Sequence, residues 1–289
     1  MSKINGKKIL STARTEYLKW ICNARMIMLF VLLIFIYSFI IEPLSLHAIK
    51  MNSPLNILEP FIATVNSEIL MIIVPAVFMA LFSDFPRTDG NTLFFLQRIG
   101  KLNWILGQIL YSLMAIVTYV VVSFMGSVAP LLAKSFWANA WSLTVTRYAR
   151  EFPNESQSFA CLLIRGNVYN QVSPFYAAFI GYALMVLYLF LISLILLLFQ
   201  CLKMKKFGML TSAAVIAFGG TMCLIRMKTM WIFPMAHASI WMHFTKYYRK
   251  PVVPMWHSFV YFIAVCICLI ALSILVLKNA SIDSVQDID

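Results

Sequence analysis

The sequence predicts an all-α integral membrane protein with six transmembrane helices in one domain, residues 1–289. Of its 289 residues, 62% are hydrophobic and only 12% are charged. A soluble domain of this length has no means of burying so much apolar surface. The hydrophobic residues also form long runs without alternating polar positions, which favours helices over membrane strands.

Six segments approach or exceed the roughly 20 apolar residues that a helix needs to cross the hydrocarbon core. They lie at 23–41, 61–82, 105–133, 174–200, 208–225 and 257–277. The first has a basic lead and is followed by Glu42-Pro43 instead of a small-residue cleavage site. We therefore expect it to be a permanent span and not a signal peptide.

The net charge of +12 lies mainly at the ends of these spans. Basic residues precede the first span and occupy the connections between spans 2 and 3 and between spans 4 and 5. By the positive-inside rule, these connections and both termini are expected in the cytoplasm. Topology therefore accounts for the charge, and we expect no nucleic-acid partner.

The segment 226–256 does not follow this pattern, because its basic residues would lie outside. Its apolar stretch 230–244 is short and contains Pro234. A re-entrant or interfacial segment is the favoured interpretation, since so few apolar residues rarely cross a bilayer. The alternative is a shortened seventh span, which would place the C-terminus outside.

Three other segments have predicted roles. Residues 5–20 can form an amphipathic helix on the cytoplasmic surface, or they are a basic tail that only sets orientation. Residues 134–173 form a long outer loop with many aromatic side chains, which suit a membrane interface. Glu68 lies within span 2, where a carboxylate marks a possible pathway unless it lies at the wet outer interface.

The sequence contains none of the motifs that would make this chain an enzyme by itself. It has no glycine-rich phosphate loop, no H-E-x-x-H and no G-x-S-x-G. Its four histidines and six cysteines have no spacing typical of a metal site. We therefore expect no catalytic residues and no metal. Few charged residues lie inside the spans, so we also expect no ion-coupled transport.

The polar connection 83–104 completes an arrangement that resembles the membrane subunit of an ABC-2-type ATP-binding-cassette exporter. The resemblance rests on the segment 5–20 and on the connection's acid-and-glycine turn, apolar run and basic pair. The residues are Asp84, Asp89, Gly90, Leu93, Arg98, Ile99, Gly100, Lys101, Trp104 and Gly107. This chain has Gly107-Gln108 where that family commonly has Gly-Lys.

The resemblance implies an elbow helix at 5–20, a coupling helix within 83–104 and a re-entrant segment before the last span. It implies a separate cytosolic ATPase that binds ATP and magnesium, a second permease copy or related permease, and a bacterial plasma-membrane location among lipids. The apolar anchors toward the ATPase would be Phe94, Phe95 and Leu96. Their polar rim would be Asp84, Asp89, Arg98 and Lys101, with Gly90 in the turn.

The expected function is therefore export of a hydrophobic or amphipathic substrate such as a peptide, an antibiotic or a lipid-like molecule. The competing interpretation of 83–104 is a connector whose charge only sets topology. The competing function is a non-transporting sensor, immunity or assembly protein that binds a ligand through loop 134–173.

Overall fold

The computed structural model describes residues 4–87, 96, 98–245 and 250–279. Within them, five helices are long and apolar enough to cross a membrane, and a bent helix pair is a candidate for a sixth span. The described strands are β1 (Leu55–Asn56) and β2 (Ser135–Phe136), which pair in parallel. The prediction of a helical fold with membrane-length apolar helices is confirmed.

The first span is longer than predicted. After α1 (Gly6–Ile21), helical structure runs from Ala24 to Lys50 through η1 (Ala24–Met26), α2 (Ile27–Ile36), η2 (Tyr37–Ile41) and α3 (Glu42–Lys50). Pro43 does not end the helix, because it follows the π-helical turn η2 and occupies the first turn of α3, where a missing N–H is tolerated. These residues extend about 40 Å, more than the hydrocarbon thickness.

The second span is broken. Helices α4 (Glu59–Asn66) and α5 (Leu70–Leu81) meet at an angle of 78°. The predicted continuous helix over 61–82 is therefore wrong at residues 67–69, where Ser67 has an extended backbone conformation. The Asn66 side chain binds Ile240 N–H at 2.9 Å, so the end of α4 is held by a distant segment.

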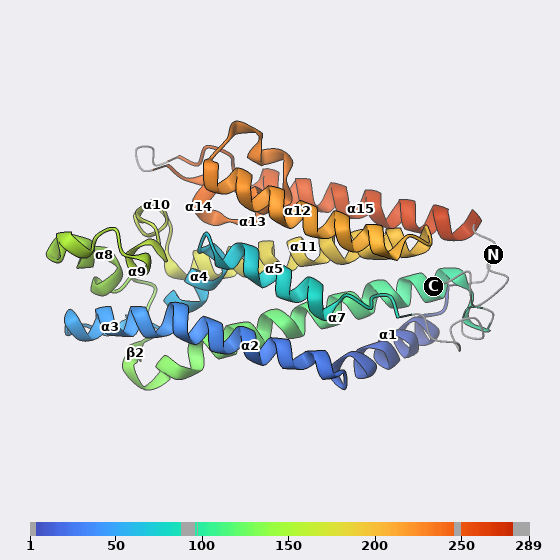
Figure 1. The fold of residues 1–289 in the computed structure, drawn as a ribbon, viewed down its shortest axis with the longest axis horizontal. Coiled ribbons are helices and arrows are strands. Elements are labelled where there is room, and N and C mark those ends of the chain that lie inside the picture. Colours follow the sequence, from blue (N-terminus) through green and yellow to red (C-terminus); the bar gives the residue numbers. More distant parts are fainter. Residues whose placement is uncertain (1–3, 88–95, 97, 246–249, 280–289) are drawn as a thin grey trace.

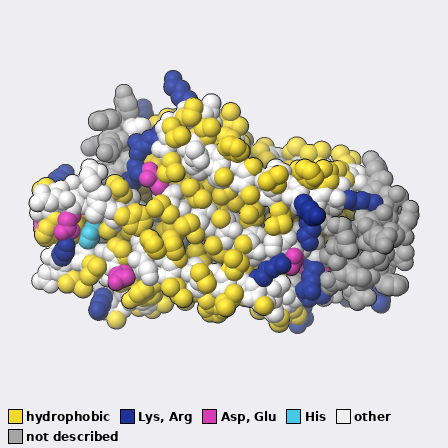
Figure 2. Space-filling view, viewed as in Figure 1, with side chains coloured by type: hydrophobic (Ala, Val, Ile, Leu, Met, Phe, Trp, Pro, Cys, Tyr) yellow, Lys and Arg dark blue, Asp and Glu magenta, His cyan; other side chains and the backbone are white. Residues whose placement is uncertain are grey.

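The four remaining spans begin and end within a few residues of the predicted positions. They are α7 (Lys101–Val128) with η3 (Ala129–Lys134), α11 (Pro174–Cys201), α12 (Lys205–Ile225) and α15 (Met255–Asn279). Helix α11 is the most buried and packs against α4, α7, α12 and α15 (Figure 1). Helices α2, α12 and α15 expose large apolar side chains, and hydrophobic side chains cover the middle of the visible face (Figure 2).

The short elements that follow α7 and α12 lie toward the half of the bundle that contains α3 (Figure 1). We call this the loop end. Its elements are α8 (Leu143–Glu151), η4 (Pro153–Glu155), α9 (Phe159–Leu162), α10 (Gly166–Tyr169), η5 (Lys228–Ile232), α13 (Pro234–Ala238) and α14 (Ile240–His243). Helices α13 and α14 are too short to cross a bilayer.

Helix α1, the start of α7 and the end of α15 lie at the opposite end of the bundle (Figure 1). We call this the basic end. Its lysines include Lys8, Lys101, Lys205, Lys206 and Lys278. The space-filling view shows Lys and Arg side chains at both ends of the molecule, with the hydrophobic face between them (Figure 2).

Candidate functional site

Helix α1 is fixed along the first half of α7. Asn5 caps α1 with its side chain and donates its backbone N–H to Oδ1 of Asn103 at 2.9 Å. Gly107 allows a close approach, because a Cβ at this position would lie 2.7 Å from Cβ of Thr12. Farther along, the hydroxyl oxygens of Tyr17 and Thr118 are 2.7 Å apart. The two helices are therefore held together over most of the length of α1.

The connection between α5 and α7 is attached to the segment before α2 and to α1. The guanidinium of Arg25 contacts the carboxylate of Asp84 at 2.6 Å and donates a hydrogen bond to Oγ of Ser83 at 2.6 Å. Near the start of α7, the ammonium of Lys8 donates to the backbone carbonyl of Arg98 at 3.1 Å. The connection is therefore joined at one end to η1, through Arg25, and near its other end to α1, through Lys8.

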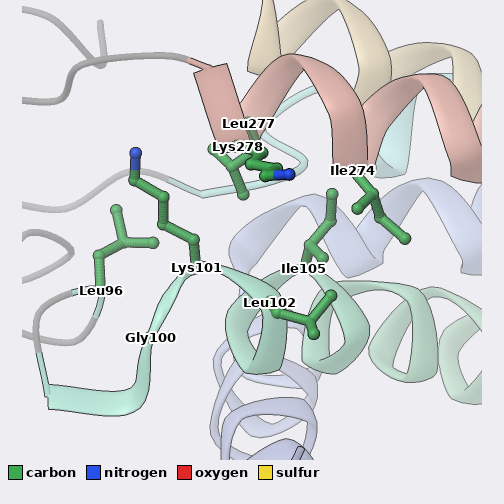
Figure 3. Close-up of a pocket in the computed structure, with 8 residues that line it drawn as sticks. All are labelled: Leu96, Gly100, Lys101, Leu102, Ile105, Ile274, Leu277 and Lys278. Atoms are coloured by element: carbon green, nitrogen blue, oxygen red, sulfur yellow. The ribbon is translucent and has the colours of Figure 1, made fainter. Parts of the chain in front are cut away.

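The residues predicted to couple to an ATPase are only partly described. Asp84 pairs with Arg25, Arg98 is exposed, and Lys101 begins α7. Leu96 is only 7% exposed and lines a pocket between α7 and α15 (Figure 3). Its side chain therefore packs within this chain and not at an exposed surface. The predicted residues Asp89, Gly90, Phe94 and Phe95 lie outside the described residues.

Glu68 lies in the break between α4 and α5, where it forms an ion pair with Arg165 from the segment before α10. The two side chains are 28% and 17% exposed. The Arg165 guanidinium lies 4.3 Å from the ring centre of Trp241, and Arg226 lies 5.5 Å from the same ring. Burial lowers the pKa of Arg165, and the charge of Glu68 opposes this shift. Glu68 is thus a paired, partly buried carboxylate.

The segment around Trp241 is held by amide side chains of the loop end. Nδ2 of Asn167 donates to the carbonyls of Trp241 and Phe244 at 2.7 and 2.8 Å. Nε2 of Gln171 donates to the Thr245 carbonyl at 2.6 Å. The break at Glu68, the long loop and the segment before α15 therefore form one connected polar region.

A second polar cluster lies on α13, α14 and α15. The Oγ of Ser258 is 2.9 Å from Nδ1 of His237 and 2.7 Å from Nε2 of His243. The remaining ring nitrogens face backbone carbonyls, at Trp231 for His237 and at Ser239 for His243, both at 2.9 Å. Because a carbonyl accepts, each of these distal nitrogens must carry a proton.

Proton counting limits what this cluster can do when both histidines are neutral. With the distal nitrogens protonated, both proximal nitrogens need a donor, but the Ser258 hydroxyl supplies one proton. Burial lowers the pKa of His237 and lowers that of His243 to about 4, so neutral rings are favoured. When both rings are neutral, one of the two ring nitrogens that face Ser258 therefore has no hydrogen-bond donor. Protonation of that nitrogen would let it donate to the Ser258 oxygen and would complete all four contacts.

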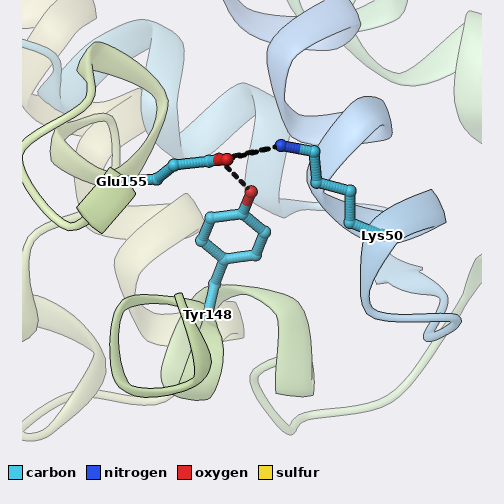
Figure 4. Close-up of polar contacts among 3 residues, drawn as sticks. All are labelled: Lys50, Tyr148 and Glu155. Atoms are coloured by element: carbon cyan, nitrogen blue, oxygen red, sulfur yellow. Dashed lines mark hydrogen bonds and ion pairs between the residues drawn. The ribbon is translucent and has the colours of Figure 1, made fainter. Parts of the chain in front are cut away.

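The loop end is anchored by two carboxylates. Glu59 is fully buried and accepts the backbone N–H groups of Asn56 at 3.0 Å and Ser142 at 2.7 Å. At the surface, Glu155 accepts hydrogen bonds from Lys50 and Tyr148 (Figure 4). These two bonds, the one from Lys50 first, lower the pKa of Glu155. The loop 134–173 is thus attached to α3 and α4.

Glu59, Arg165, Trp241 and Ser258 were not identified as site residues from the sequence. The only signal was the presence of charged or polar residues near apolar segments, which does not identify partners. Several partners lie far away in the chain, as Ser142 is 83 residues from Glu59. Of the four histidines, His237 and His243 are buried together, with His243 0% exposed.

Among the described residues, no group of three or more His, Cys, Asp and Glu side chains could hold a metal ion. No protein-family model, curated protein or solved structure matches this chain.

Proposed function

We propose that this chain is the membrane subunit of a transporter, of the ABC-2 type, that a separate cytosolic ATPase drives from the basic end. The observation that carries the proposal is the attachment of the α5–α7 connection to Arg25 and to Lys8. A surface connector that only set topology would need no such attachment to neighbouring helices. The substrate would be hydrophobic or amphipathic, such as a peptide, an antibiotic or a lipid-like molecule.

The proposed mechanism converts ATPase closure into movement of α7. ATP and magnesium would bind to the partner, whose closure would displace the α5–α7 connection. Helix α1 would act as the elbow and move with α7, because they are packed through Gly107. Tyr119 of α7 donates a hydrogen bond to the Val74 carbonyl of α5 at 2.7 Å, which links α7 to the broken span. A second permease copy would complete the pathway.

Charge reversal at the basic end tests this proposal. The tagged chain is purified in mild detergent from its native host, and bound proteins are identified by mass spectrometry. We expect a phosphate-loop ATPase with the wild type, and at least tenfold less, on the order of 1.4 kcal/mol, with Arg98→Glu. Arg150→Glu, at an exposed site of the loop end, is the matched control and should retain the ATPase.

The second candidate is a non-transporting sensor or immunity protein that binds a ligand at the loop end. The observation that favours it is the anchoring of loop 134–173 by Glu59 and by Glu155. It predicts that no ATPase is recovered with the folded wild type.

Recovery of equal amounts of ATPase with Arg98→Glu and with the wild type would place coupling elsewhere and contradict the transporter proposal.

A further inference from the structure

The last part of the first span, α3, is joined to α2 by an irregular turn. In η2 the helix is π-helical, and the N–H of Glu42 donates to the carbonyl of Tyr37, five residues earlier. Pro43, the next residue, has no N–H to donate back into this turn. π-Helical turns within α-helices are frequent at functional sites. The backbone between α2 and α3 therefore lacks a hydrogen bond that a continuous α-helix would have.

Aromatic side chains of loop 134–173 pack along this part of the span. Phe159 of α9 lies edge-on to Phe39 of η2, with ring centres 6.3 Å apart. Tyr148 of α8 stacks on His47 of α3, with ring centres 3.6 Å apart and the two planes 13° from parallel. The loop thus contacts both the irregular turn and the helix that follows it.

An ion pair joins the end of α3 to the same loop (Figure 4). The Lys50 ammonium donates to both carboxylate oxygens of Glu155, at 2.7 and 2.9 Å, and the Tyr148 hydroxyl donates to the same carboxylate at 2.5 Å. We call Lys50, Tyr148 and Glu155 the α3 latch. The side chains of Lys50 and Glu155 are 47% and 41% exposed, so water competes for the ion pair and it can break reversibly.

The two sides of this contact are not closely packed. A cavity of about 50 Å³, with space for a few water molecules, lies between α3 and the loop. Leu44 of α3 lines one side, and Val145 and Ile164 line the other. The loop side is fixed to α4, because the buried carboxylate of Glu59 accepts the N–H of Ser142 at the start of α8. If the contact opens, α3 is therefore the side that moves.

We propose that α3 is a hinged arm that turns about η2 and Pro43, and that the α3 latch holds it against loop 134–173. Opening separates α3 from α8 and enlarges the cavity between them, while α2 keeps its place in the membrane. An event at the loop that draws Glu155 away from Lys50 would thereby release the end of the first span. The proposal does not rest on the proposed transport function, because opening is a property of this chain alone.

Hydrogen–deuterium exchange of the full-length chain in dodecyl maltoside tests the latch, with α2 as the internal reference. Exchange by local opening follows the population of the open form. Glu155→Lys places a second cation beside Lys50 and removes the acceptor of Tyr148. We expect the amides of α3 to exchange up to about fivefold faster, with those of α2 unchanged. Lys50→Glu/Glu155→Lys restores opposite charges and should return most of the way to the wild-type rate.

Two further variants separate the latch from general charge and test the hinge. Glu151→Lys reverses an exposed charge of the same α8 and should leave α3 exchange unchanged. Pro43→Ala supplies the missing N–H and should slow α3 exchange about fivefold. Wild-type exchange of α3 in either Glu155→Lys or Pro43→Ala would overturn the proposal. An increase in α2 as large as that in α3 would also overturn it, because the whole span would then loosen.

Discussion

The guanidinium of Arg25 lies 2.6 Å from the carboxylate of Asp84 and joins the start of the first span to the end of the second. The two side chains are 40% and 43% exposed. An exposed pair of this kind contributes at most about 1 kcal/mol to folding. Its importance in our account is therefore positional, because it fixes where the α5–α7 connection leaves the membrane domain.

Breaking this pair should uncouple the connection without unfolding the chain. We expect Asp84→Asn to change the free energy of unfolding by less than about 1 kcal/mol. ATP hydrolysis by the assembled complex should lose its response to substrate, because movement is no longer transmitted to the first span. Arg25→Asp/Asp84→Arg restores opposite charges and should recover part of the response. Full activity in Asp84→Asn would contradict this role.

Gly107 should be intolerant of a side chain. A Cβ there would lie 2.7 and 2.8 Å from Cβ and Cγ2 of Thr12, so α1 must shift. We expect Gly107→Ala to destabilise the protein by about 1–3 kcal/mol through overpacking. Gly6→Ala, in the first turn of the same α1, has no atom within 4 Å of the added Cβ and should be neutral. Thermal unfolding in detergent compares them, and equal melting temperatures would refute the tight α1–α7 contact.

The Ser258 hydroxyl should contribute more to the free energy of unfolding than the hydroxyl of Ser273, the other buried serine of α15. Removing its hydroxyl leaves ring nitrogens of His237 and His243 without a partner, at a cost of about 1–3 kcal/mol. Ser273 is equally buried, but it only donates to the Leu269 carbonyl within the helix. Ser273→Ala should therefore cost less than about 0.5 kcal/mol. Similar melting temperatures for the two variants would contradict the role of Ser258 as the shared partner of His237 and His243.

Stability should fall on acidification because of the same cluster. The pKa of His243 is lowered to about 4 in the folded state, and an unfolded histidine titrates near 6.5. Between these values the unfolded chain binds more protons, so stability is present above pH 6.5 and is lost toward pH 4. In His243→Asn the fall in melting temperature over pH 6.5–4.5 should be smaller than in the wild type. An identical pH profile would show that His243 does not titrate as described.

The Glu68–Arg165 pair should stabilise the bend between α4 and α5. Both side chains are less than a third exposed, so an unpaired Arg165 would keep a poorly solvated charge. We expect Glu68→Gln to cost about 1–3 kcal/mol. The double variant Glu68→Gln/Arg165→Gln should cost less than the sum of the single variants. Additive losses in chemical unfolding would mean that the two residues act independently.

The positions of the spans could be predicted because apolar length alone defines them. The end of the first span was missed, since Pro43 follows a π-helical turn that no local signal marks. The break in the second span was missed because it depends on contacts such as that of Asn66 with Ile240, 174 residues away.

The polar sites were predictable only as single residues. Glu68 was a candidate because a carboxylate within a span is costly, but its partner Arg165 lies 97 residues later in the chain. Asp84 was a candidate through its place in a polar connection, and its pairing with Arg25 could not be read from spacing. Side chains that meet through tertiary packing leave no periodic signal in one sequence.

A photo-crosslinking amino acid at position 98 tests the central claim most directly, in native membranes and without detergent. Our account predicts a covalent adduct with a phosphate-loop ATPase at position 98, identified by mass spectrometry, and no such adduct with the same probe at position 150. An ATPase adduct from position 150, or none from position 98 while the protein is folded and membrane-inserted, would contradict coupling through the basic end.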